Sequence, residues 1–172
     1  MVTVTSRGTA VVTLPTDTQI KIVREFNASR RLVYKAYTTP ALIKRWWGAK
    51  RGEVTVAEVD LRVGGKWRYV SVTSDGLDVG FHGEFREIVP NERIVWTEIF
   101  EGMPDMELTP DQLDASASLN TLSLTEQGGR TTLTILSDFP SREIRDLVIE
   151  TGMEAGMQDA MDLLEEVAVS LA

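Results

Sequence analysis

The 172-residue sequence contains no cysteine and only one histidine, His82. Without cysteine the protein can form no disulfide bond, no zinc–thiolate site and no cysteine nucleophile. One histidine cannot supply a typical zinc site, because such sites take three or four protein ligands. The sequence also shows no phosphate-binding loop, nucleophile elbow or paired-carboxylate motif. We therefore expect no metal and no other cofactor.

Basic residues and long apolar runs are also scarce. The chain has 18 Lys and Arg residues against 26 Asp and Glu residues, so its net charge is −8. An acidic surface repels nucleic acids and anionic membranes. No run approaches the roughly 18 apolar residues of a membrane span, and no signal peptide is visible at the N-terminus. Together with the absence of cysteine, this predicts a cytoplasmic protein that binds neither nucleic acid nor a membrane.

The strongest pattern lies in the last thirty or so residues, from Ser141 onward. Apolar side chains recur there every three or four residues, which is typical of one buried helix face. They are Met153, Met157, Ala160, Met161, Leu164, Val167 and Leu171. We predict one long helix. Gly152 and Gly156 each cost a helix roughly 1 kcal/mol relative to alanine, so they favour a kink or the close approach of another group.

Most of the remaining chain is predicted to form strands. Residues 1–17 are predicted to be a tail or a short extra strand over 9–14, and residues 18–172 a single domain. The domain starts with a half-buried strand at 19–26 and two short helices near 30–37 and 40–47. Six strands follow, at 54–61, 66–73, 78–89 (bulged near Gly83), 93–101, 117–126 and 130–139. Residues 102–115 are predicted to be an acidic loop.

The order of these elements predicts how they pack. Short hairpin connections require a mostly antiparallel sheet, and the long amphipathic helix has only this sheet on which to bury its apolar face. Leu122 and Leu124 would lie beside Leu133 and Ile135 on the helix-facing side. The predicted fold is α+β, with a curved antiparallel sheet of about seven strands around the C-terminal helix.

Several short motifs resemble one known family. They are residues 36–42 (AYTTPAL), 45–48 (RWWG), 60–67 (DLRVGGKW), 83–88 (GEFREI) and 152–157 (GMEAGM). Together they resemble the activator-of-heat-shock-protein-ninety-ATPase homologue group of the START-like (SRPBCC, helix-grip) superfamily, from about residue 19 to the C-terminus. Two departures are Ser29, where the family often has proline, and the long acidic loop.

The resemblance implies a helix-grip fold with a cavity between the sheet and the long helix. Members of the superfamily include lipid and hormone carriers and polyketide cyclases and aromatases. The eukaryotic chaperone activator carries such a domain beside a separate N-terminal domain that is missing from this sequence. Chaperone activation is therefore not transferred to this chain.

The candidate ligand-binding residues are those expected to face the predicted cavity. They are Trp46, Trp47, Trp67, Tyr69, Phe81, Trp96, Glu98, Phe100, Met153, Met157 and Met161. Methionine fits irregular space, although Trp and Met at such positions are more often plain core. Glu98 faces either the cleft, where burial would raise its pKa, or solvent. A lone histidine such as His82 is more often structural than catalytic.

Three functions are compatible with these observations. The first is the binding of a small apolar or amphipathic ligand between the sheet and the helix. The second is an enzyme of the cyclase or aromatase kind that uses Glu98, His82 or Tyr69 as acid and base. The third is a protein-interaction module, including a homodimer that uses the sheet face or the acidic loop.

Overall fold

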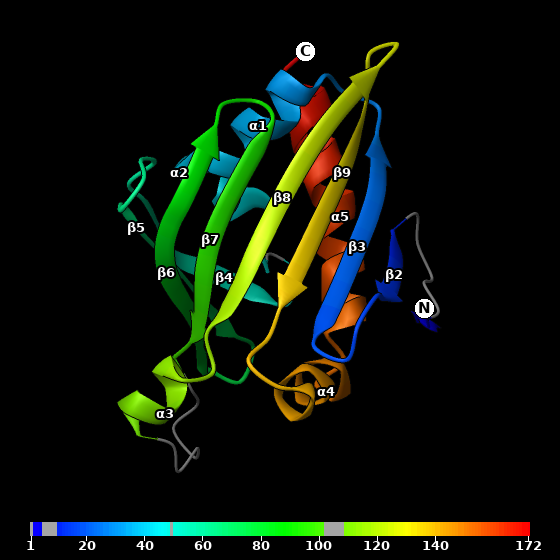
Figure 1. Ribbon diagram of the computed structural model, residues 1–172. Helices are drawn as coiled ribbons and strands as arrows, with labels where there is room; N and C mark the ends of the chain where they lie inside the picture. The colour runs from blue at the N-terminus through cyan, green and yellow to red at the C-terminus, as the bar shows by residue number, and fades with distance from the viewer. Residues whose placement is uncertain (1, 5–9, 49, 102–108) are drawn as a thin grey trace.

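A computed structural model describes residues 2–4, 10–48, 50–101 and 109–172. Its centre is a nine-stranded sheet in the order β1-β2-β3-β9-β8-β7-β6-β5-β4, with every neighbouring pair antiparallel (Figure 1). The strands are β1 (Val2–Val4), β2 (Val11–Leu14), β3 (Gln19–Phe26), β4 (Gly52–Val59), β5 (Lys66–Thr73), β6 (Asp78–Val89), β7 (Arg93–Phe100), β8 (Ser118–Gln127) and β9 (Arg130–Asp138).

The prediction of about seven strands was therefore slightly too low. The short strand predicted within residues 9–14 is present as β2, which pairs with β3. Strand β1 was not predicted, because three residues are too few for an alternating pattern to be recognised. The chain thus adds two strands beyond β3 to the predicted seven.

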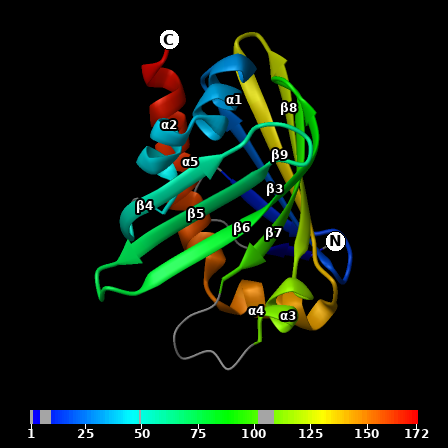
Figure 2. The same ribbon diagram turned by 90° about the vertical axis from the view of Figure 1, so that its left-hand side faces the viewer.

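Helices lie on the concave face of this sheet. The two short helices α1 (Arg30–Thr38) and α2 (Pro40–Trp46) follow β3, as predicted, and pack against the C-terminal helix α5 (Met153–Ser170). In Figure 2 the strands β4, β5 and β6 cross in front of α5 at a steep angle to β8 and β9, so the sheet bends around the helix. This is the predicted arrangement of a sheet that grips a terminal helix.

The prediction of one continuous C-terminal helix from Ser141 was wrong. The segment forms two helices, α4 (Arg142–Glu150) and α5, separated at Gly152. Gly152 has a φ of +78°, which lies in the left-handed region where glycine ends helices readily. The Ser141 hydroxyl accepts a hydrogen bond from the Ile144 N–H and caps α4, which lies across the end of the sheet (Figure 1).

The core lies between α5 and the central strands. Met161, Leu164 and Val167 of α5 are buried, and Met153 and Met157 are partly buried against the same core. On the sheet, Leu122 pairs with Ile135 and Leu124 with Leu133, as the alternation predicted. All four of these strand residues are buried.

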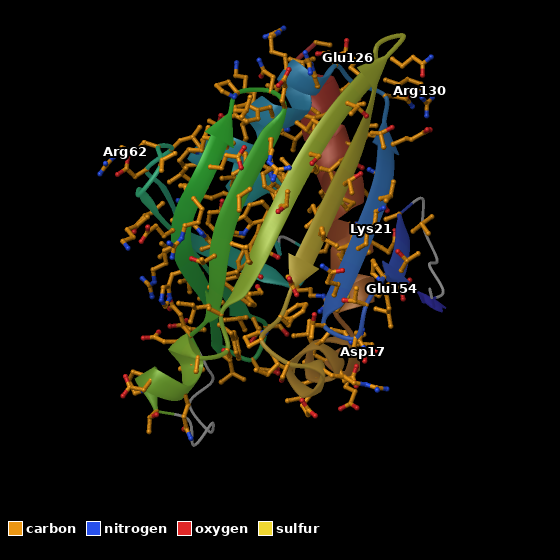
Figure 3. All side chains as sticks on the ribbon, viewed as in Figure 1. Asp17, Lys21, Arg62, Glu126, Arg130 and Glu154 are labelled. Carbon is orange, nitrogen blue, oxygen red and sulfur yellow. The ribbon has the colours of Figure 1, made fainter. Side chains whose placement is uncertain are left out.

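The strand connections follow the turn chemistry of the sequence. Asp60 and Arg62 form an ion pair before the double glycine, with Nε and Oδ2 2.9 Å apart, and Arg62 lies at the exposed β4–β5 turn (Figure 3). The bulge predicted near Gly83 lies between Phe85 and Glu87.

In the predicted acidic loop, residues 102–108 lie outside the described part of the chain, and Pro110–Asp114 form the short helix α3, which Thr109 caps.

Candidate functional site

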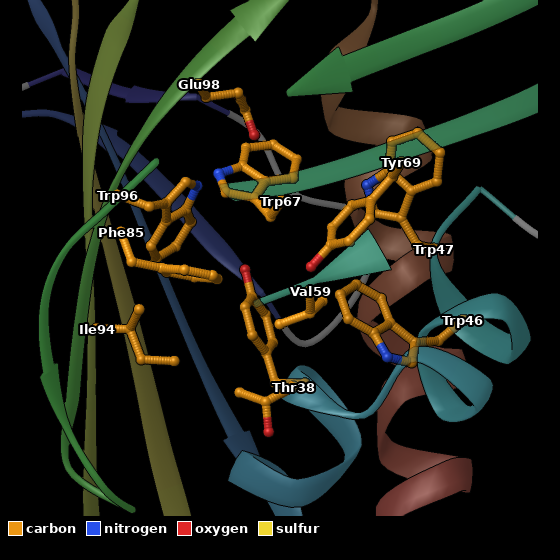
Figure 4. A pocket seen from close by; sticks show the side chains of 11 residues that line it. Thr38, Trp46, Trp47, Val59, Trp67, Tyr69, Phe85, Ile94, Trp96 and Glu98 are labelled. Atoms are coloured by element: carbon orange, nitrogen blue, oxygen red, sulfur yellow. The ribbon is translucent and has the colours of Figure 1, made fainter. Parts of the chain in front are cut away.

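A cavity of about 70 Å³ lies between the sheet and the helix pair α1 and α2 (Figure 4). The residues that line it come from α1, from α2 and the residue after it, and from the four strands β4 to β7. They are Tyr37, Thr38, Trp46, Trp47, Val59, Trp67, Tyr69, Phe85, Ile94, Trp96 and Glu98. Seven of these eleven side chains are aromatic, and Glu98 is the only one that carries a charge.

The wall of the cavity differs from the prediction. We expected Met153, Met157 and Met161 of the C-terminal helix to line it, and none of them does. The reason is that α1 and α2 pack against α5 and provide the helical wall themselves. The three methionines belong instead to the core and its border.

Six of the other candidate residues do line the cavity: Trp46, Trp47, Trp67, Tyr69, Trp96 and Glu98. Phe81 and Phe100 lie behind them. The Phe81 ring packs on Trp47 with 5.9 Å between ring centroids, and on Phe100 with 5.2 Å. The phenylalanines therefore support Trp47 without reaching the cavity.

Strand alternation explains why the sheet residues converge. Trp67 and Tyr69 are two residues apart on β5, and Trp96 and Glu98 are two residues apart on β7, so each pair points to one face. Phe85 pairs with Trp96 across β6 and β7 and joins the same face. In Figure 4, Glu98 points from its strand toward Trp67, and the Tyr69 hydroxyl points into the space among the rings.

Two indoles are fixed by hydrogen bonds to the backbone. The Trp46 Nε1–H donates to the Ala36 carbonyl oxygen at 2.9 Å, which joins α2 to α1. The Trp67 Nε1–H donates to the Thr97 carbonyl oxygen at 3.1 Å, which joins β5 to β7 across β6. Trp46 therefore anchors the short helix and at the same time lines the cavity.

Five further residues line the cavity and were not predicted to do so: Tyr37, Thr38, Val59, Phe85 and Ile94. Ile94 shares the alternation of Trp96 and Glu98, so the strand pattern alone could have found it. Tyr37 sits at the end of α1, and its ring lies 5.1 Å from Trp46 and 6.1 Å from Trp96 between centroids. Only the tertiary packing of α1 on the sheet brings Tyr37 to the cavity.

Glu98 faces the cavity and is partly buried. Burial raises the pKa of its carboxyl group to about 7, and an interaction with the Trp96 side chain opposes this shift by favouring the charged form. In the described part of the chain no Lys, Arg or His side chain forms an ion pair with Glu98. Its negative charge is therefore poorly compensated.

Two phenols share the cavity with Glu98. Burial raises the pKa of Tyr69, and the charge of Glu98 raises it further. The pKa of Tyr37 is also raised, first by burial and then by the charges of Tyr69 and Glu98. Both hydroxyl groups are therefore neutral near pH 7 and can donate or accept hydrogen bonds.

His82 lies on the opposite face of the sheet. Its Nδ1 is 2.9 Å from Oε2 of Glu101, and Arg68 donates to both carboxylate oxygens of Glu101 at 2.9 Å. These hydrogen bonds lower the pKa of Glu101, with the Arg68 contribution first. Because His82 is turned away from the cavity, it cannot act there together with Glu98.

A second hollow of about 350 Å³ is lined by residues of β2, β3, β9 and α5 and by Asn27. Four of the residues that line it are charged: Arg24, Glu25, Arg130 and Glu165. It is larger than the aromatic cavity but more open to solvent, and it does not suit an apolar ligand. No three His, Asp or Glu side chains come together as a metal-binding group in the described ranges.

Replacing Glu98 with glutamine should change how stability depends on pH. The folded-state pKa of about 7 lies above the ordinary value of 4.5, so the wild type loses stability as pH rises between these values. At about pH 8 we expect Glu98→Gln to be more stable by about 1–2 kcal/mol, a figure reduced for partial exposure. At about pH 4 the two proteins should be equal.

Urea denaturation across this pH range measures the difference. Glu53→Gln is the matched control, because Glu53 is exposed on β4 and should give no such trend. Equal stabilities of wild type and Glu98→Gln at about pH 8 would contradict the burial of the Glu98 charge.

The curved antiparallel sheet around a C-terminal helix, with a cavity on its concave face, defines a helix-grip protein of the START-like superfamily. The chain belongs to the family described as Activator of Hsp90 ATPase homolog 1-like protein, whose model matches residues 27–168. The resemblance seen in the sequence is thus confirmed. No curated protein matches the chain.

Solved structures share the fold. A protein from Rhodobacter sphaeroides is 24% identical, with a TM-score of 0.80 over 94% of this chain and 98% of that chain. A protein from Arthrobacter aurescens is 26% identical, with a TM-score of 0.78 over 92% of this chain and 91% of that chain. Ms6760 from Mycobacterium smegmatis is 23% identical, with a TM-score of 0.78 over 94% and 98%.

Within the described residues, no helix combines the length and the apolar character needed to cross a bilayer.

Proposed function

We propose that this protein binds a small, largely apolar molecule with one polar group in the aromatic cavity. The observation that carries the proposal is the lining of the cavity, where seven aromatic side chains surround a single carboxyl group. Ligand sites are typically concave and apolar, with a few polar groups that fix orientation. Tyr37, Tyr69 and Glu98 provide such groups.

The volume limits what this cavity holds. At about 70 Å³ it is roughly half the 150 Å³ of an engineered apolar cavity that binds benzene. A compact group of a few heavy atoms therefore fits better than a ring. A larger ligand requires movement of the lining, in which Trp47 is only partly buried and lies just after the end of α2.

All four tryptophans of the chain line the cavity, so intrinsic fluorescence reports directly on its occupation. We expect 3,3-dimethylbutan-1-ol and phenol, both of which require movement of the lining, to change the tryptophan emission in a saturable way. Val59→Phe places a ring in the cavity and should weaken this binding by at least tenfold.

Val63→Phe is the matched control, because Val63 is 61% exposed and outside the cavity. It should bind these alcohols like the wild type. If no small apolar probe gives a saturable change, or if Val59→Phe binds as well as Val63→Phe, the proposed function is wrong.

An acid–base enzyme of the cyclase or aromatase kind is a second candidate. It is favoured by the convergence of Glu98 and Tyr69 on one cavity, since a pKa near 7 suits a general acid or base at neutral pH. His82 takes no part in this version, because it lies on the other face of the sheet. An enzyme would convert a bound ligand into a product, and this conversion should be lost in Glu98→Gln. A carrier would release the ligand unchanged.

A further inference from the structure

We propose that the ligand carries an organic ammonium group, which lies among the aromatic rings beside Glu98. This inference rests on the proposed function, because it names the chemical class of the ligand in the same cavity. Three features of the cavity favour such a ligand: the arrangement of its rings, the single carboxylate of its lining, and its size.

Six of the seven rings pack in two groups, with Trp47, Trp67 and Tyr69 in one and Tyr37, Trp46 and Trp96 in the other. Trp67 and Tyr69 lie 4.8 Å apart between centroids, Trp47 and Tyr69 5.4 Å, and Tyr37 and Trp46 5.1 Å. The electron-rich faces of such rings attract cations within about 6 Å, and tryptophan does so most strongly. Aromatic cages of this kind are typical sites for methylated ammonium groups.

The charge of the site points to the same class of ligand. Glu98 is the only charged residue of the lining, which contains no Lys, Arg or His. A carboxylate in apolar surroundings is stabilised when a cation pairs with it. A ligand cation would supply this partner, whereas an anionic ligand such as a fatty acid would be repelled.

The size of the cavity also favours a compact head group. A cavity of about 70 Å³ admits a small ammonium group as it stands. The trimethylammonium of choline is about as bulky as the benzene that occupies an engineered cavity of about 150 Å³, so it requires the same movement of the lining as any larger ligand. The net charge of −8 further raises the local concentration of cations around the protein.

Binding should depend on pH through Glu98. The titratable groups that face it are Tyr37 of α1 and Tyr69 of β5, and both phenols stay neutral because their pKa values are raised. Glu98 itself gains its charge near pH 7. Affinity for a cation should therefore rise as the pH increases from about 5.5 to 8, while affinity for a neutral ligand should not.

The test compares choline with 3,3-dimethylbutan-1-ol, which has the same shape without the charge. Tryptophan fluorescence of the purified protein is titrated with each at about pH 8 and pH 5.5. At the higher pH we expect choline to bind at least tenfold more tightly than the alcohol. This preference should fall to threefold or less at pH 5.5, and likewise in Glu98→Gln at either pH.

The possible results separate the ammonium inference, the role of Glu98 and the proposed function from one another. If choline and the alcohol bind equally in the wild type at pH 8, the ammonium inference is overturned while the proposed function stands. If choline is preferred equally at both pH values, the role given to Glu98 is overturned, and this comparison needs no variant to fold. If neither compound nor phenol binds, the proposed function itself fails.

Discussion

Replacing Gly83 with alanine is expected to destabilise the protein by about 3 kcal/mol or more, because the added methyl group meets backbone that cannot easily move. A Cβ atom at this position would overlap the Thr97 carbonyl oxygen and lie 2.7 Å from Trp67 Nε1. These two atoms form the hydrogen bond that crosses β6 beside Gly83. The missing side chain thus makes room for the Trp67 indole.

The same variant should also disturb the cavity. Since Trp67 lines it, displacement of the indole should shift the tryptophan emission in the folded protein. Chemical denaturation measures the loss of stability, and the emission spectrum without denaturant measures the change at the site.

Gly80→Ala is the matched control on the same strand. There a Cβ atom would approach Glu101 Oε1 at 2.6 Å. This atom ends a side chain whose partners Arg68 and His82 are 46% and 41% exposed, so the group can shift at a smaller cost than the Thr97 backbone. We expect a loss below about 1.5 kcal/mol. If Gly83→Ala proves as stable as Gly80→Ala, the Trp67 indole does not pass over β6 in contact with Gly83.

Replacing Arg24 with methionine is the second large effect, with an expected loss of about 2–3 kcal/mol. Arg24 is 4% exposed and connects β3 to α5. Its Nη1 donates to the Met161 carbonyl oxygen at 2.7 Å, and its Nη2 donates to Asp162 Oδ1 at 2.9 Å. Its guanidinium also lies over the Phe26 ring, 4.7 Å from the centroid.

Methionine keeps the apolar length of this side chain but removes every one of these polar interactions. The carboxylates of Asp162 and Glu165 are 48% and 27% exposed, so water compensates them in part. For this reason we expect less than the 3–5 kcal/mol typical of breaking a fully buried pair. The loss should appear as a lower urea midpoint with an unchanged denaturant slope.

Arg31→Met is the control for Arg24→Met, because Arg31 is exposed on α1 and should change stability by less than about 0.5 kcal/mol. A double-mutant cycle with Asp162→Asn then isolates the ion pair. A loss at Arg24 no larger than at Arg31 would show that this side chain does not hold α5 on the sheet.

Local patterns in the sequence predicted the fold well. Alternation placed Leu122 and Leu124 on the buried face beside Ile135 and Leu133, because side chains of a strand point to opposite faces in turn. The same alternation explains why Arg24 lies on the buried face with Ile20 and Ile22. The break at Gly152 was the main local error, because a glycine within a helical pattern does not show whether the helix continues or ends there.

The aromatic cavity was only partly predictable. Trp67 and Tyr69 share one strand face, as do Trp96 and Glu98, so their convergence follows from alternation once the sheet is known. The sequence did not show whether Glu98 faces the cavity or solvent. Alternation divides the residues of a strand between two faces, but it does not show which face is covered by helices. The packing of α1 and α2 on the sheet decided it.

The sequence by itself determined the family, the antiparallel sheet, the apolar face of α5 and the chemical types of the site residues. These depend on spacing and composition along the chain. Only the tertiary structure decided that α1 and α2, rather than Met153, Met157 and Met161, form the helical wall of the cavity. The physical reason is that a helix packs against whichever neighbours best fill its apolar face, and that choice depends on surfaces far apart in the sequence.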